Sequence, residues 1–384
     1  MTELRDFSWS EVCARRLERH GLAAPLKDAR PADVAGAMAG VHAQVMSAAE
    51  VGIGMRLGTG TRQDVRDALW KERSLVKTYG LRGTVHLVPA RDLALWVGAL
   101  SALPLIQPRH RPDTGLTPGQ TEEVVAAIRE ALADTELTVD ELTDEVVART
   151  GPWAGDLVME AFQGKWPRWR QAMHLAGMRG ALCFAPDRGR KAAFTDPRRS
   201  VPGFVPAAPE EALPWLVRSH LHAYGPSTPQ RFAHWTNVPP AWAKELFASL
   251  GDALEPVLVE GEAAWVAAGD LAVPETAPHG VRLLPYFDGY AYRVGNQPPA
   301  LLYPGEAADR ARRGNFQLLL VDGTVAGRWH QRRSGRKLAV TVESFTGLSP
   351  ARLDDLGRQT ARLGEILEAV PTLTLGPVTT GGHA

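Results

Sequence analysis

The sequence predicts an α+β protein in which groups of helices each lead into a β-hairpin, followed by a β-rich tail. Three observations support this prediction. The apolar period changes from helical to alternating near residue 75. A second region repeats that change with similar residues, and the chain beyond residue 281 is rich in short apolar runs separated by turn residues.

Composition limits the class of protein. At 384 residues the chain is long enough for more than one domain. The 43 basic residues are balanced by 43 acidic residues, which excludes a uniformly basic surface but not a local basic face. The two cysteines, Cys13 and Cys183, suggest neither a disulfide framework nor a metal knuckle. Without an apolar leader or a membrane-length run, we expect a soluble, cytoplasmic protein with no membrane partner. We also expect it to be a monomer.

The first section begins with a helix start signal. Ser8 is expected to be the N-cap, with Glu11 at the capping-box position, and the helix should run to about residue 20. A second helix, over residues 31–44, would carry His42 and Gln44 near its C-terminal end. A third is expected at residues 61–71, before alternating runs at 75–79 and 84–88 that predict a hairpin.

Three helices followed by a two-stranded hairpin are the layout of a winged helix-turn-helix. The second section predicts a helix at 118–134, a Thr138–Glu141 capping box and a helix at 166–175. Residues 177–186 then match residues 80–89 in Gly, Arg, Gly and Pro at identical spacing. This match predicts an internal structural repeat, and therefore a second winged unit.

A third unit and the tail complete the chain. Helices at 211–223, 228–235 and 240–250 precede strands at 257–259 and 264–266, which predicts a third winged unit. Apolar runs and Asp-Gly and Ser-Gly turns then predict a small antiparallel sheet or barrel, with a last helix at 350–369. The apolar runs are at residues 283–284, 301–303, 316–321 and 338–342. The predicted domains are residues 1–113, 114–205, 206–280 and 281–384.

His42 and Gln44 are the leading candidates for chemistry. They stand two residues apart in a segment of small and apolar residues, where folding does not require them. A capping or surface pair is the alternative interpretation, because such triplets arise often by chance.

Several other polar residues are candidates for DNA contact. Arg82 and Arg179 occupy matching positions in the repeat, where each either touches phosphate or braces its own hairpin. Thr84 and His86 belong to the first hairpin, and His86 faces either the DNA or the interior. In the tail, a basic run beside Trp329 is either a solvated face or a nucleic-acid-facing turn. Its candidate residues are Arg328, His330, Arg332 and Arg333.

Several motifs are missing from the sequence. It has no Gly-x-x-x-x-Gly-Lys phosphate loop, no His-Glu-x-x-His helix and no Gly-x-Ser-x-Gly elbow. We therefore expect neither a cofactor nor a metal. Asp288, between Phe287 and Gly289, is expected to have a structural role rather than to contact substrate.

Five stretches together resemble the bacterial AlkZ-like (YcaQ-like) winged-helix DNA glycosylases, and the resemblance covers nearly the whole chain. These stretches are residues 42–44, 81–88, 223–226, 284–290 and 320–327. The resemblance implies three tandem winged helices in a C-shaped arrangement around double-stranded DNA, with a β-rich tail. It also implies cleavage of the N-glycosidic bond of alkylated purines, in DNA repair or self-resistance, including crosslink unhooking in some members. The family's usual catalytic motif is Gln-x-Gln or Gln-x-Asp.

His42 stands where the family's usual motif has its first Gln. The change resembles a His-x-Gln subgroup associated with bulky N7-guanine adducts. An N7-alkylguanine is already cationic, so its glycosidic bond breaks without an acid, and the enzyme has mainly to position water. Gln44 can orient that water, and His42 either accepts its proton or only holds it.

A monofunctional glycosylase without lyase activity is expected, because Lys77 lies in a predicted strand where solvated lysines are common. The competing hypothesis is a non-catalytic winged-helix DNA-binding protein or transcription regulator. A regulator prefers one undamaged sequence, whereas a repair enzyme binds undamaged DNA weakly and without sequence preference.

Overall fold

The computed structural model describes residues 4–106, 113–161, 164–291 and 297–379. It combines helices and strands, as the sequence predicts, in two compact units. The first unit comprises Met1–Asp67, Val217–Trp235 and Pro240–Ala384, and the second comprises Ala68–Leu216 and Thr236–Pro239. The boundaries of the four predicted domains, their winged-helix character and their C-shaped arrangement stay predictions.

The N-terminal part of the first unit is mainly helical. Ser8 caps the first helix and Glu11 closes the capping box, which confirms the predicted helix start. The elements are β1 (Asp6–Phe7), α1 (Trp9–Arg19), α2 (Pro31–Ala37), β2 (Val41–His42), α3 (Met46–Gly54) and α4 (Arg62–Trp70), whose last residues enter the second unit.

The predicted helix over residues 31–44 is wrong beyond Ala37. Ala39 and Gly40 have φ values of 51° and 93°, which lie outside the helical region and end α2. Strand β2 and then α3 follow, so His42 lies in a strand and Gln44 in a loop.

A helix group and a hairpin also occur in the middle of the chain, as predicted. The elements are α10 (Pro209–Tyr224), α11 (Pro229–Thr236), α12 (Pro240–Ser249), β10 (Leu254–Val259) and β11 (Glu262–Ala267). Strand β10 pairs antiparallel with β11 and parallel with β1. Phe7, Val12 and Val257 are among the buried residues that hold this sheet against α1.

The tail folds as an open five-stranded sheet in the order β12-β13-β14-β15-β16. Its strands are β12 (Val281–Leu284), β13 (Gln317–Val321), β14 (Thr324–Ser334), β15 (Lys337–Ser344) and β16 (Val370–Leu375). Asp322 and Gly323 both have positive φ and form the predicted turn. The sheet is not purely antiparallel, because β15 and β16 run parallel.

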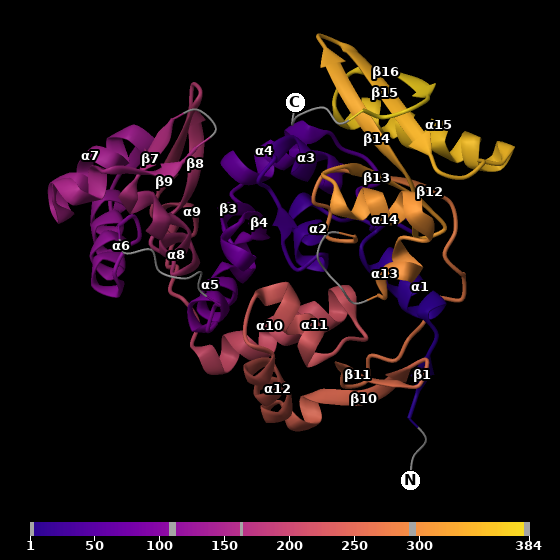
Figure 1. Cartoon of the computed structure of the whole chain (residues 1–384), viewed down its shortest axis with the longest axis horizontal. Helices are drawn as coiled ribbons and strands as arrows, with labels where there is room; N and C mark the ends of the chain where they lie inside the picture. Colours follow the sequence, from indigo (N-terminus) through magenta and orange to yellow (C-terminus); the bar gives the residue numbers. More distant parts are fainter. Residues whose placement is uncertain (1–3, 107–112, 162–163, 292–296, 380–384) are drawn as a thin grey trace. The chain divides into compact units, whose positions relative to one another are not determined.

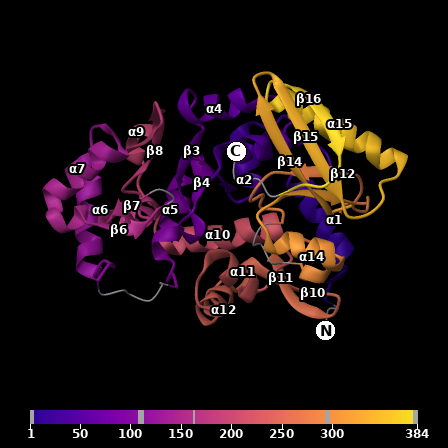
Figure 2. The same cartoon turned by 45° about the horizontal axis from the view of Figure 1, so that its top comes forward.

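Three helices accompany this sheet, namely α13 (Pro299–Leu302), α14 (Gly305–Arg313) and α15 (Pro350–Ile366). Figures 1 and 2 show α15 lying along the sheet, where Leu356, Leu363 and Ile366 pack against its buried residues. The last helix is therefore confirmed. The apolar run at residues 301–303 does not join the sheet, because a proline in the first turn favours the short helix α13 there.

The second unit begins with the predicted hairpin of β3 (Leu75–Tyr79) and β4 (Val85–Pro89). Its helices are α5 (Leu93–Ala102), α6 (Pro118–Leu132), α7 (Val139–Thr150), α8 (Met173–Met178), α9 (Pro197–Ser200) and the first part of α10. Its other strands are β5 (Glu136–Thr138), β6 (Leu157–Glu160), β7 (Lys165–Pro167), β8 (Cys183–Arg188) and β9 (Lys191–Thr195). The capping box of Thr138 and Glu141 is present.

One expectation for this unit is wrong and another holds in part. Residues 166–175 do not form one helix, because Trp166 belongs to β7 and Pro167 favours extended backbone before it. The matching segments 80–89 and 177–186 also differ. The first begins as the β3–β4 turn, whereas the second begins at the end of α8. Their strands correspond, and so do Gly83 and Gly180, which have φ values of 69° and 66° and donate to Gly80 O and Gly177 O.

Candidate functional site

The loop between α2 and α3 presents the two leading candidates. The left-handed residues Ala39 and Gly40 turn the chain sharply after α2, and Gly40 N donates to Ala35 O at 2.8 Å. His42 is half-buried and Gln44 is exposed, while Ala43 between them is buried. The alternation places both polar side chains away from the core, on the same side of a short extended segment.

Phe287 packs against the histidine of this motif. Its ring centroid lies 4.8 Å from that of His42, with 45° between the two ring planes. Phe287 has a φ of 60°, which is unusual for an aromatic residue and requires support from its surroundings. The segment after β12 therefore contributes one wall to the environment of His42.

The support comes from a buried ion pair directly beside Phe287. Arg56 donates two hydrogen bonds of 2.8 Å to the Asp288 carboxylate, and the two side chains are only 0% and 2% exposed. Arg56 also donates to Gly52 O, and Asp288 accepts from the Tyr290 amide at 3.0 Å. This agrees with the structural role expected for Asp288.

A second set of contacts fixes the end of α2. The Tyr224 hydroxyl donates to Met38 O at 2.8 Å, and His20 Nε2 lies 2.9 Å from Ala223 O. Burial, together with the nearby Arg56 and Arg16, lowers the pKa of His20 well below its usual value. The neutral imidazole is therefore the stable form in this position.

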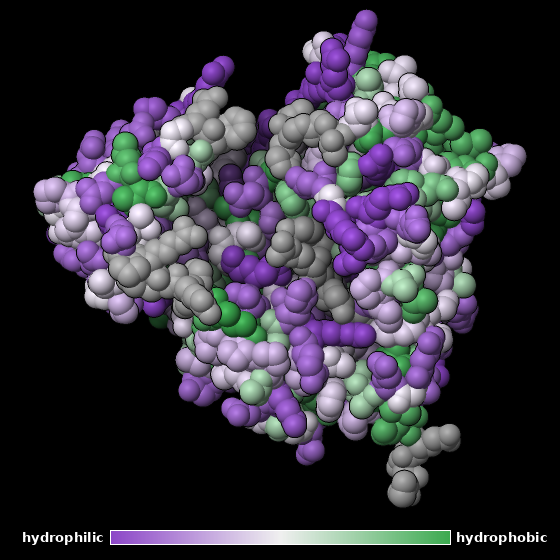
Figure 3. Space-filling view, in the orientation of Figure 1, coloured by the Kyte–Doolittle hydropathy of each residue, from purple (hydrophilic) through white to green (hydrophobic). Residues whose placement is uncertain are grey.

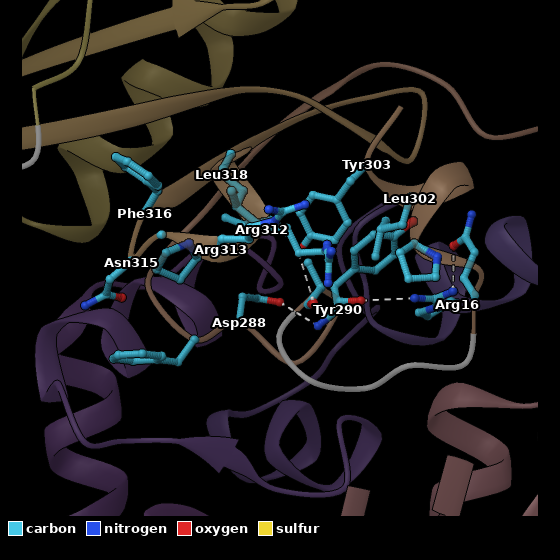
Figure 4. Close-up of a pocket in the computed structure, with 18 of the residues that line it drawn as sticks. Arg16, Asp288, Tyr290, Leu302, Tyr303, Arg312, Arg313, Asn315, Phe316 and Leu318 are labelled. Carbon is cyan, nitrogen blue, oxygen red and sulfur yellow. Dashed lines mark hydrogen bonds between the residues drawn. The ribbon is translucent and has the colours of Figure 1, made fainter. Parts of the chain in front are cut away.

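A cavity of about 490 Å³ opens beside the Phe287 and Asp288 segment. Figure 4 shows Tyr290, Tyr303, Arg312 and Arg313 among the side chains around it. Burial raises the pKa of Tyr303 to about 12, although Arg312 and Arg16 act in the opposite direction. The phenol is thus neutral at physiological pH, and its hydroxyl donates to Ala291 O at 3.2 Å.

The second unit holds four of the predicted DNA-contact residues. Arg82 and Thr84 are half-buried in the β3–β4 turn, where Thr84 Oγ1 donates to Leu81 O at 3.0 Å. His86 is buried, with Nδ1 3.0 Å from Thr84 O. Arg179 lies at the end of α8 and forms a bidentate ion pair with Glu122. The hairpin therefore turns His86 inward and leaves Arg82 and Thr84 nearer the surface.

The first unit holds the other four, all on β14. Alternation along this strand puts Arg328, His330 and Arg332 on one face and Arg333 on the other. Arg328 is ion-paired with Glu343 at 2.8 Å, whereas Arg332 and Arg333 are exposed near the strand end. Figure 3 shows hydrophilic side chains at the top, where Figure 1 places the projecting end of β14 and β15.

Lys77 is better packed than a solvated lysine. It is half-buried in β3, with Nζ 4.6 Å from the ring centroid of Phe184. Across the described parts of the chain, no three His, Cys, Asp or Glu side chains are grouped as a metal site. No helix in the described ranges has the length and apolar character needed to span a membrane.

Sequence reasoning missed the partners that shape this site. Arg56 is a single arginine between apolar residues, and nothing local marks it as the partner of Asp288. In the sequence, the segments containing Tyr224 and Phe287 stood out only because they resemble the family. Nothing in them indicated that they approach the His42 loop.

Comparison with known proteins adds the family context. Residues 35–366 match the family described as DNA glycosylase AlkZ-like. The chain is 32% identical over 336 residues to an interstrand DNA cross-link repair glycosylase of Streptomyces sahachiroi, covering 84% of this chain and 87% of that protein. The solved structure of Streptomyces sahachiroi DNA glycosylase AlkZ superimposes with a TM-score of 0.79 at 26% identity. That match covers 97% of this chain and all of the other.

Proposed function

Because the chain belongs to the AlkZ-like DNA glycosylase family, we propose that it hydrolyses the N-glycosidic bond of cationic N7-alkylguanine in duplex DNA. The proposed substrates include bulky genotoxin adducts, in repair or self-resistance. One observation carries the proposal. His42 and Gln44 share one side of a short segment, inside the region that matches the family. The His42 ring also packs on Phe287 at the edge of a cavity.

The chemistry of a cationic base suits this pair of side chains. Water adds to C1′ of the deoxyribose, and the electron pair of the C1′–N9 bond leaves with the guanine, neutralising its N7 cation. The Gln44 amide orients the water, since it can both donate and accept hydrogen bonds. His42 receives the proton that the water loses, or holds the water while solvent takes that proton.

The surroundings of His42 limit how its ring can move. Phe287 packs on the ring, and the buried pair of Arg56 and Asp288 fixes the backbone that carries Phe287. A fixed imidazole lowers the cost of reaching the reactive arrangement, because little orientation remains to be lost on binding.

The central test is release of the modified base from a duplex that carries a bulky N7-guanine adduct, under single-turnover conditions. His42→Ala and Gln44→Ala should each slow release by about 10²-fold or more, the usual scale for removing a positioned proton acceptor or donor. His279→Ala is the matched control, because His279 is exposed and is bonded only within its own turn.

Two results would count against the proposal. Absence of release from several cationic adducts, together with tight binding to one undamaged sequence, would favour a transcription regulator. A borohydride-trapped covalent complex with DNA would contradict the monofunctional part of the proposal, which assigns no nucleophilic role to Lys77.

A further inference from the structure

The cavity of the first unit and the proposed catalytic motif share one neighbouring aromatic ring. Phe287 lines this cavity of about 490 Å³ and also packs on His42. The volume lies within the roughly 300–1,000 Å³ of pockets that bury drug-sized ligands. This volume is much larger than that of the single water molecule that hydrolysis requires. The cavity can therefore hold a larger group as well.

The walls of the cavity favour a flat, aromatic group. Among the described residues, it is lined by the imidazole of His234 and by the rings of Phe287, Tyr290, Tyr303 and Phe316. Leu302 and Leu318 add aliphatic surface from α13 and β13. Aromatic rings pack favourably on other rings in stacked or edge-on arrangements, so a planar ring system uses this surface better than an aliphatic chain.

The charge of the cavity favours acceptor oxygens on that group. Arg16 is 1% exposed and donates to Tyr290 O and to Gln297 Oε1, and its buried Nε has no hydrogen-bond partner. No carboxylate among the described residues pairs with Arg16. Arg312 and Arg313, also in the wall, share the single carboxylate of Asp309. Asp288 also lines the cavity, and its carboxylate is paired with Arg56. Among the described residues in or bonded to this wall, the arginines at 16, 56, 312 and 313 therefore outnumber the carboxylates at 288 and 309.

We propose that this cavity binds the part of a bulky adduct that is not the nucleobase, as a planar aromatic group bearing anionic or carbonyl oxygens. The inference rests on the proposed glycosylase function. The reactive C1′ atom would then lie at the motif, on one side of Phe287, and the aromatic group would lie in the cavity beyond it. A free DNA phosphate is a poorer match, because it leaves the aromatic surface unused.

Binding of 9-anthracenecarboxylate to the full chain, followed by fluorescence, tests the cavity without any excision step. The carboxylate should bind more tightly than the neutral 9-anthracenemethanol. Arg313→Ala should weaken carboxylate binding about tenfold, or about 1.4 kcal/mol. Arg310→Ala is the matched control. It removes an exposed arginine of the same helix, also ion-paired with an acid four residues earlier, that does not line the cavity.

Excision rates distinguish a failure of this inference from a failure of the proposed glycosylase function. The ratio of kcat/KM for an aromatic N7-guanine adduct to that for N7-methylguanine should fall about tenfold in Arg313→Ala and stay constant in Arg310→Ala. Equal losses on both substrates would assign Arg313 to DNA phosphate and overturn the inference. Failure of the unaltered chain to bind the anthracene acid would overturn it too. If the unaltered chain binds the anthracene acid but excises neither base, the proposed glycosylase function is overturned instead.

Discussion

Asp288 supports the segment that packs against His42, because its carboxylate pairs with the buried Arg56. Asp288→Ala would leave Arg56 charged and buried, which costs about 3–5 kcal/mol of unfolding free energy. Base release should also slow at temperatures where the variant is folded, because Phe287 loses its support. Urea unfolding and single-turnover release measure the two effects.

Glu306→Ala is the control for the change at Asp288. Glu306 pairs with Arg310 at the surface, where both side chains are largely exposed, so its loss should cost less than about 1 kcal/mol. A change of similar size in both variants would contradict the role given to the buried pair.

His220 predicts a pH dependence of stability. Burial, with a smaller effect of Arg231, lowers its pKa to about 3, whereas in the unfolded chain it is near 6.5. Below pH 6.5 the unfolded chain therefore takes up a proton that the folded chain does not, and stability falls as pH falls. Between pH 7.5 and 5.0, His220 should account for about 2 kcal/mol of that loss.

The measurement is urea unfolding at both pH values. In His220→Gln the fall in unfolding free energy should be smaller by that amount, while the exposed His279→Gln should behave like the unaltered chain. Parallel pH dependences for all three proteins would show that His220 is protonated in the folded state.

Residue types made His42 and Gln44 candidates for chemistry, because two polar side chains in a small apolar segment stand out, and the family resemblance favoured them over a chance pair. Their surroundings did not follow from the sequence. Arg56 and Asp288 are 232 positions apart, and a single sequence has no local pattern that links such a pair. The residues that approach the motif thus emerged only from the folded chain.

At the scale of elements, local sequence signals correctly predicted the helix caps and turns that depend only on neighbouring residues. Ser8 with Glu11, Thr138 with Glu141, and the Asp322-Gly323 turn all form as expected, since each depends on neighbouring residues. Helix α5 gave no amphipathic signal, because its apolar residues are buried on most sides. The end of α2 was missed because Ala39, an ordinary helix former, adopts positive φ there.

The exposed end of β14 should contribute to general DNA affinity. Arg332→Ala should weaken binding to undamaged duplexes of any sequence and make the slope of log K against log salt shallower by about 0.9, the value for one phosphate contact. Fluorescence anisotropy over a range of salt concentrations measures both quantities. Arg328→Ala should change the slope less, because Arg328 is already paired with Glu343 and stacked on Phe316. Identical slopes for Arg332→Ala and the unaltered chain would remove Arg332 from the interface.

At the scale of the whole molecule, the lack of a carboxylate in the motif predicts selectivity for cationic bases. N7-alkylguanine should be released, while uracil, which needs more help to leave, should remain attached. Mass spectrometry of the base released from matched duplexes gives the answer. Uracil excision at a comparable rate would contradict the roles proposed for His42 and Gln44.

The Tyr224 hydroxyl bond to Met38 has a consequence for how the chain acquires activity. That bond joins residues 186 positions apart, and the ion pair behind Phe287 joins residues 232 apart. Contacts of such sequence separation form slowly, because a long loop must close before they stabilise anything. The His42 loop therefore reaches its final arrangement only after synthesis has passed residue 288, so a growing polypeptide with a complete N-terminal motif should still be inert toward DNA.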